Sequence, residues 1–204
     1  MTKNNYQIFQ QILQQVKQQE KKPTLLLHSC CAPCSSACIQ QLCDYFEITV
    51  FYYNPNISPA TEYEKRKQEQ IKFISEFNNS VKFLDCDYNP MEFYGLVKGL
   101  EDCEERGERC VKCYSLRMQK TCETARQNGF DYFATTLTLS PLKDEKVINQ
   151  IGLHLQEEFS QKYMVSNFKK NNGYLNSINL SKQFNLYRQD YCGCVFSKKK
   201  KIFD

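Results

Sequence analysis

The sequence lacks the features that mark membrane-spanning and secreted proteins. No apolar run approaches the roughly 20 residues needed to cross a bilayer, and the first residues, Met1 to Tyr6, contain no apolar signal core. We therefore expect a cytoplasmic protein with no membrane partner. Glycine is also scarce. None occurs between Met1 and Tyr94, so the turn after the first predicted strand cannot be a glycine-rich phosphate-binding loop.

Internal repeats and linkers rich in glycine and serine are missing as well. We expect one domain over residues 1–204, with an N-terminal helix in 1–22 and a C-terminal extension from about 171 to 204. The 41% hydrophobic and 25% charged residues are typical of a globular chain with a substantial core. The net charge of +4 does not by itself indicate a nucleic-acid partner.

The spacing of apolar residues predicts strands that alternate with helices. Strands are expected at 24–27, 47–53, 81–86, 130–135 and, as a last short strand, 163–168. Helices are expected at 5–21, 33–45, 59–78, 91–100, 110–128 and 144–159. Ser58 is the expected N-cap of the third helix and Pro59 its first residue. This alternation predicts an α/β fold with a largely parallel sheet, and an extension folded back over the sheet edge.

Twelve cysteines are the most informative part of the composition. In a reducing cytosol they indicate metal or redox chemistry rather than structural disulfides. The first group, Cys30 and Cys31, follows the predicted strand at the edge where open α/β sheets place ligands. In a strand-to-helix turn both thiols can converge on one metal cluster, and Cys34, one turn into the helix, could join them. The alternative is a pair of buried structural thiols. His28 is expected to be a hydrogen-bonded core residue rather than a ligand.

The second group is Cys110 and Cys113 at the start of a predicted helix. Residues three apart share a helix face, and Arg117, four residues further on, lies on it too. A helix N-terminus lowers the pKa of a thiol. With Cys30 and Cys31, these residues supply four soft ligands for an iron–sulfur cluster or a zinc ion. Structural zinc usually uses two C-x-x-C pairs, so the adjacent cysteines favour iron–sulfur.

The third group is Cys192 and Cys194, separated by Gly193. A C-x-C of this kind can chelate one metal or close a strained, redox-active disulfide; two unrelated buried thiols are the alternative. The other cysteines have no partner pattern and are assigned to packing or the surface: Cys38, Cys43, Cys86, Cys103 and Cys122.

Basic residues are clustered in two places. Lys198 to Lys201 are typical of a solvated terminus. The other cluster is interleaved with cysteines and consists of Arg106, Arg109, Lys112, Arg117 and Lys120.

Taken together, these residues resemble the QueH-type epoxyqueuosine reductases, which act on tRNA. The resemblance runs from Leu25 to Ser197. It is carried by Leu27–Cys34, Tyr53–Ile57, Glu62–Tyr63, Arg109–Cys110, Cys113–Tyr114, Leu116–Arg117, Phe130–Phe133, Thr135–Leu137, Ser140–Pro141, Leu186–Gln189 and Tyr191–Cys194.

The resemblance implies a Rossmann-like sheet akin to adenine-nucleotide hydrolase-like domains. It implies a 4Fe-4S cluster on Cys30, Cys31, Cys110 and Cys113. It also implies that Cys192 and Cys194 act as a redox pair or hold a second, mononuclear iron. Some relatives carry an aspartate where this chain has Cys34, and that aspartate can ligate the second metal. Here a thiolate would replace the carboxylate.

The implied reaction removes the epoxide oxygen of epoxyqueuosine at the wobble position, with two electrons from an external donor and two protons, and gives queuosine and water. Asp190 and Tyr191 are candidate proton donors, with structural hydrogen bonding as the alternative. Arg117 and Arg188 are candidates for contacts to phosphate or substrate, with loose surface ion pairs as the alternative. Asp87, after the third strand, could also face the substrate.

A wobble base must leave the anticodon loop to enter a pocket, so recognition would combine phosphate contacts with stacking on aromatic rings. The candidates are Tyr174, Phe184, Tyr187, Tyr191, Lys169, Lys170 and Arg188. Two rival functions remain open at this point. One is an ATP-using iron–sulfur tRNA sulfur-transferase, which needs the phosphate loop that is missing here. The other is a non-catalytic four-cysteine protein that binds metal and docks on RNA.

Overall fold

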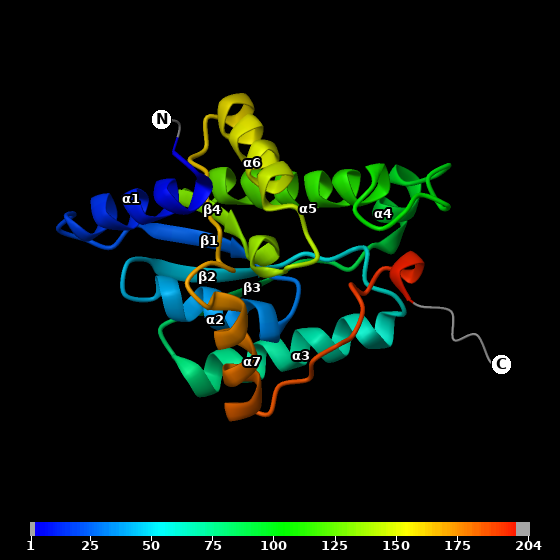
Figure 1. The fold of residues 1–204 in the computed structure, drawn as a ribbon, viewed down its shortest axis with the longest axis horizontal. Helices are drawn as coiled ribbons and strands as arrows, with labels where there is room; N and C mark the ends of the chain where they lie inside the picture. Colours follow the sequence, from blue (N-terminus) through cyan, green and yellow to red (C-terminus); the bar gives the residue numbers. More distant parts are fainter. Residues whose placement is uncertain (1–2, 199–204) are drawn as a thin grey trace.

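The computed structural model describes residues 3–198 and contains a four-stranded, wholly parallel sheet. Its strands are β1 (Thr24–His28), β2 (Glu47–Tyr52), β3 (Lys82–Asp85) and β4 (Tyr132–Thr135), in the spatial order β3-β2-β1-β4. β1 pairs with β2 on one side and with β4 on the other (Figure 1). The α/β, Rossmann-like fold class predicted from the sequence is confirmed.

Helices connect the strands and cover both faces of the sheet. They are α1 (Asn5–Lys17), α2 (Ala32–Leu42), α3 (Ala60–Phe77), α4 (Pro90–Leu96), α5 (Glu108–Gln127), α6 (Glu145–Phe159) and α7 (Gly173–Gln183), with short 3-10 helices at Thr136–Leu139 and Val195–Ser197. Figure 1 shows α5 and α6 on one side of the sheet and α2, α3 and α7 on the other. None of the helices in the described part of the chain is long and apolar enough to cross a bilayer.

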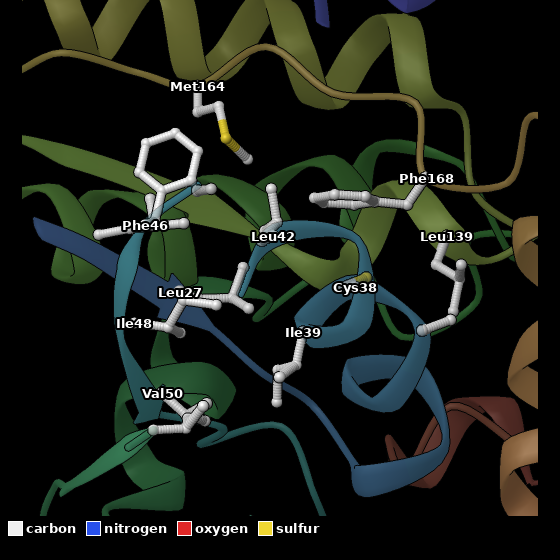
Figure 2. Packing of buried hydrophobic residues seen from close by; sticks show 14 of the residues in the cluster. Leu27, Cys38, Ile39, Leu42, Phe46, Ile48, Val50, Leu139, Met164 and Phe168 are labelled. Atoms are coloured by element: carbon white, nitrogen blue, oxygen red, sulfur yellow. The ribbon is translucent and has the colours of Figure 1, made fainter. Parts of the chain in front are cut away.

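The side chains of β1 alternate between two buried clusters, as a strand requires. Leu25 and Leu27 face the cluster formed with α1, α2, α3 and α7, whereas Leu26 faces the cluster formed with α5 and α6. Figure 2 shows the first cluster, where Leu27 and Val50 of the sheet lie with Ile39 of α2. Both faces are therefore buried, which explains why β1 is a continuous leucine run.

The strand expected at 163–168 does not form, and this prediction is wrong. Only Tyr163 makes a bridge, with Phe133 of β4. The chain then turns away because the side chain of Asn149 on α6 satisfies the backbone of Ser166. Asn149 Oδ1 accepts from the Ser166 amide at 3.0 Å, and Asn149 Nδ2 donates to the Ser166 carbonyl at 2.9 Å. These two bonds replace the ones a neighbouring strand would supply.

Three smaller expectations also need correction. α1 ends at Lys17 rather than 21, because the last buried apolar residue of its stripe is Val16. The N-cap of α3 is Pro59, without a side-chain hydrogen bond, while the Ser58 amide donates to the Gly193 carbonyl at 2.9 Å. The C-terminal extension begins with α7, which packs on α2, and the segment after α7 reaches the carboxyl edge of the sheet.

Gly152 of α6 offers a test of this packing. A Cβ at Gly152 would lie 2.3 Å from a ring carbon of Tyr163, so Gly152→Ala must displace that ring or the helix. We expect it to lower the free energy of unfolding by about 1–3 kcal/mol. Gly95→Ala in α4, where nothing lies within 4 Å, is the matched control and should be neutral or stabilising by helix propensity. Denaturant titration measures the free energy of unfolding of both variants. A Gly152→Ala protein as stable as wild type would contradict the close packing of Tyr163 on Gly152.

Candidate functional site

A cavity of about 400 Å3 opens at the carboxyl edge of the sheet, where the chain leaves β1 and β4. In the order β3-β2-β1-β4, the connections after β1 and β4 run in different directions, which makes this point the natural ligand site of an open α/β sheet. Three segments distant in the sequence line it with cysteines. The cysteines that line the cavity are Cys30, Cys34, Cys110, Cys113, Cys192 and Cys194.

The tightest group of thiols comprises Cys30, Cys31 and Cys34. Their sulfurs all lie within 4.8 Å of one another, and those of Cys30 and Cys31 are 3.8 Å apart. Cys31 has an extended backbone and is the N-cap of α2, so the chain turns there from strand to helix and brings Cys34 back toward the pair. Three converging thiols are a soft ligand set that could hold a metal.

The four-cysteine ligand set predicted from the sequence is arranged more loosely. Cys110 and Cys113 lie in the first two turns of α5 and line the same cavity as Cys30. They are not part of the compact group of thiols around Cys30, Cys31 and Cys34. The cluster assignment to Cys30, Cys31, Cys110 and Cys113 therefore stays a prediction.

The protonation of these thiols follows their surroundings. Hydrogen bonds from the Cys31 and Cys34 thiols lower the pKa of Cys30 well below its usual range, and the pKa of Cys31 rises to about 12. The lowered thiol pKa that is expected at a helix start is not found at Cys113, where burial raises the pKa to about 12. Burial likewise raises the pKa of Cys194 to about 11. A metal that binds these thiols must displace their protons.

Buried polar side chains fix the loop that carries the first cysteines. Gln70 Oε1 on α3 accepts from the hydroxyls of Ser29 and Ser35, both at 2.7 Å. Asn54 Nδ2 donates to the Ser29 carbonyl at 2.8 Å. Asn54 lies in a segment that carries the family resemblance, but sequence reasoning missed Gln70. The available signal was its place in the buried stripe of α3, between Tyr63 and Phe73.

His28 is a core residue, as predicted. It is fully buried, its Nε2 lies 3.1 Å from the Tyr53 carbonyl and its Nδ1 lies 3.0 Å from the Thr135 hydroxyl. A carbonyl only accepts, so Nε2 carries the proton and Nδ1 accepts from Thr135. Burial, helped by the charge of Arg117, lowers the pKa of His28 to about 3. The imidazole is therefore neutral, with both nitrogens occupied.

Two of the five cations that line the cavity, Arg117 and Lys143, influence the ionisation of its Cys30 thiol. Arg117 is 1% exposed, so the alternative of a loose surface ion pair is wrong for it. Its Nε donates to the Cys113 carbonyl at 3.2 Å, whereas its Nη2 has no partner within residues 3–198. The second cation is Lys143, which sequence reasoning missed. Burial opposes its charge, but the thiols of Cys192 and Cys30 raise the pKa of Lys143.

The other predicted site residues divide into two sets. Asp190, Tyr191, Arg188 and Tyr174 line the cavity, and Arg188 Nη1 donates to the Ser177 carbonyl at 3.2 Å and the Ser181 hydroxyl at 3.0 Å. The remaining candidates lie away from the cavity lining and are Tyr187, Phe184, Asp87, Lys169 and Lys170.

Two aromatic candidates for base stacking are covered by other side chains. Lys65 Nζ lies 3.4 Å from the centre of the Tyr187 ring, and the Tyr187 hydroxyl faces Glu62. The Phe184 ring packs edge-on against Phe73 and Phe77. In the basic clusters, Arg106 and Arg109 line the cavity, and Lys112 lies 3.4 Å from Glu108 on the exposed side of α5. Of the C-terminal lysines only Lys198 is described, and Lys199 to Lys201 lie outside the described residues.

Fold and site together define a Rossmann-like α/β protein with a cysteine-lined, candidate metal-binding centre. The family model described as "Epoxyqueuosine reductase QueH" matches residues 25–200. Relatives of that name include a protein of Streptococcus pyogenes serotype M1, 42% identical over 99% of this chain and 81% of the relative. Others are from Staphylococcus epidermidis (40% identical, 99% and 88% covered) and Thermotoga maritima (38%, 85% and 90%). The chain belongs to the QueH family.

The support of the cysteine loop by Gln70 can be tested directly. Gln70→Leu removes the oxygen that accepts from Ser29 and Ser35, so the loop should loosen and any metal on it should be held less firmly. We expect roughly tenfold weaker retention, as for the loss of other residues that orient ligands. Iron remaining after titration with a chelator is the measurement. Gln68→Leu, at an exposed position of the same helix, is the control; equal retention in both variants would contradict the role of Gln70.

Proposed function

We propose that this protein is an epoxyqueuosine reductase that acts on tRNA in queuosine biosynthesis. Membership in the QueH family supports the activity. The structural observation that supports it most is that three cysteine-bearing segments meet at one cavity. Removal of the epoxide oxygen breaks two C–O bonds, forms a carbon–carbon double bond and releases water. It consumes two electrons and two protons, so the site needs an external reductant and proton donors. Because tRNA is the substrate, we place the protein in the cytoplasm.

The donor set of the cavity fits an iron–sulfur cofactor. Its cysteines are soft ligands, and the charges of Lys143 and Arg117 add to the thiol hydrogen bonds that lower the pKa of Cys30. We assign Cys30, Cys31, Cys110 and Cys113 to a 4Fe-4S cluster. The thiols of Cys34, Cys192 and Cys194 remain for a second iron, or Cys192 and Cys194 act as a redox pair. Such a cluster supplies electrons one at a time.

The chain's own residues have definite tasks in this reaction. Arg117 is the best placed to stabilise negative charge on the epoxide oxygen, because its buried Nη2 has no partner in the described part of the chain and it lines the cavity. Lys143 also lines the cavity and adds a second positive charge. Asp190 and Tyr191 line the cavity beside Cys192 and are the candidate proton donors. Each task uses a side chain that faces the space where substrate would lie.

The rim of the cavity is suited to a nucleotide that has left its stack. Exposed cationic side chains line it for contact with phosphate, namely Arg106 and Arg188. Tyr174 and Tyr191 line it as well and supply rings for stacking. Tyr187 and Phe184 are not assigned to stacking, because neither lines the cavity.

Reductase activity is the first outcome to measure. Protein purified without oxygen, given a chemical reductant and tRNA that carries epoxyqueuosine, should convert the base to queuosine, detected by mass spectrometry of digested tRNA. Cys30→Ala should abolish conversion, whereas Cys43→Ala, at the end of α2, should convert at the wild-type rate. A colourless protein that holds only zinc, or an active Cys30→Ala variant, would exclude this assignment.

Binding of tRNA should depend on salt. Each phosphate contact releases counterions, so affinity should fall steeply between about 50 and 200 mM salt. Arg106→Gln removes one cation from the rim and should reduce the slope of log K against log salt by roughly one. Filter binding at several salt concentrations measures this, with Lys72→Gln on the outer face of α3 as control. A slope equal to that of wild type would remove Arg106 from the tRNA surface.

A further inference from the structure

A buried arginine on α3 holds the Cys192–Gly193–Cys194 loop against the body of the protein. Arg66 is 1% exposed, although it lies in a charged run, Glu62 to Lys67, that would ordinarily face solvent. Its guanidinium donates to two consecutive carbonyls of the loop, through Nη1 to Cys192 at 3.1 Å and through Nη2 to Tyr191 at 3.5 Å. The guanidinium also lies 5.1 Å from the centre of the Tyr191 ring.

The next carbonyl along the chain, that of Gly193, is also hydrogen-bonded by the region around α3. The Ser58 amide, just before α3, donates to the Gly193 carbonyl at 2.9 Å. Gly193 has a φ of +104°, a conformation that favours glycine. A Cβ there would lie 2.9 Å from both Arg66 Nη1 and a side-chain carbon of Ile57. The loop therefore needs glycine both for its backbone conformation and for its close approach to Arg66.

Glu62 completes the arrangement. It accepts from Arg66 Nε at 2.7 Å and lies 3.3 Å from the Tyr187 hydroxyl, so one carboxylate joins the arginine to the chain that leads into the loop. Two turns of α3 further on, Glu69 accepts from the Tyr187 amide at 2.9 Å. All three guanidinium nitrogens of Arg66 are thus used, one toward Glu62 and two toward the loop.

We propose that Arg66 is a positioning residue that fixes Cys192 and Cys194 at the wall of the cavity. The inference rests on the proposed function in assigning chemistry to these two thiols. Arg66 itself does not line the cavity, so it acts through the loop and not on the substrate. The planar guanidinium of Arg66 matters because its two Nη donors reach two adjacent carbonyls, which a single ammonium group cannot do in the same geometry.

The decisive variant is Arg66→Lys, which keeps the charge beside Glu62 but loses the two Nη donors. Hydrogen exchange of the protein purified without oxygen should then be roughly tenfold faster in residues 187–197 and unchanged in the sheet. The melting temperature should stay close to that of wild type. In turnover, kcat should fall while KM for tRNA is kept. Lys72→Gln, an exposed cation on the same helix, should match wild type in every measurement.

A purely structural role for Arg66 predicts a different outcome. In that case Arg66→Lys would leave both the exchange rate of residues 187–197 and kcat at their wild-type values, and this result would overturn the proposal. If Arg66→Lys does not fold, Gly193→Ala takes its place, because the added methyl pushes the loop from the arginine. It should speed exchange in 187–197 alone, and wild-type exchange there would also overturn the proposal. Exchange is measured without tRNA, so a wild-type protein that fails to reduce epoxyqueuosine refutes the proposed function and leaves this test intact.

Discussion

The position of β1 between β2 and β4 is the constraint on which the site depends. With β2 and β3 on one side and β4 on the other, the chains that leave β1 and β4 diverge and leave a crevice between them. The turn after β1 carries Cys30 and Cys31, and the segment after β4 brings Lys143 to the cavity that Cys30 lines. The N-terminal end of α5 and the C-terminal segment close the remaining sides. A strand order that separated β1 from β4 would move the Cys30 turn and Lys143 apart along the carboxyl edge of the sheet.

The features that the sequence predicted well are those set by local pattern. The leucine run of β1 fits a strand buried on both faces, and the helix after Pro33 begins where its fixed φ predicts. The placement of Cys30 and Cys110 at one cavity also followed from pattern, because a cysteine after a parallel strand and a cysteine at a helix start both lie at the functional edge. His28 was placed correctly because a lone histidine at a strand end has backbone and hydroxyl partners within reach.

Other features depend on contacts between distant residues and leave little trace in the local pattern. The apolar stretch 163–168 resembles a strand, but a single asparagine on α6 satisfies the backbone that a neighbouring strand would have needed. Arg66 and Gln70 stand in polar surroundings, and their burial becomes visible only when their positions are counted against Tyr63 and Phe73 on α3. The pKa of Cys113 illustrates the same limit, because burial in the folded protein outweighs the effect of the helix start.

The C-terminal segment has a consequence for the order in which the molecule is built. Both buried clusters draw nearly all of their members from residues before 181, with Leu186 as the last. Cys192 and Cys194 therefore join a framework that the earlier chain already provides. Because synthesis proceeds from the N-terminus, these two thiols leave the ribosome after every other cysteine. Two of the three cysteine-bearing segments can meet before the third arrives, and the cavity gains this wall only after all four strands of the sheet have been synthesised.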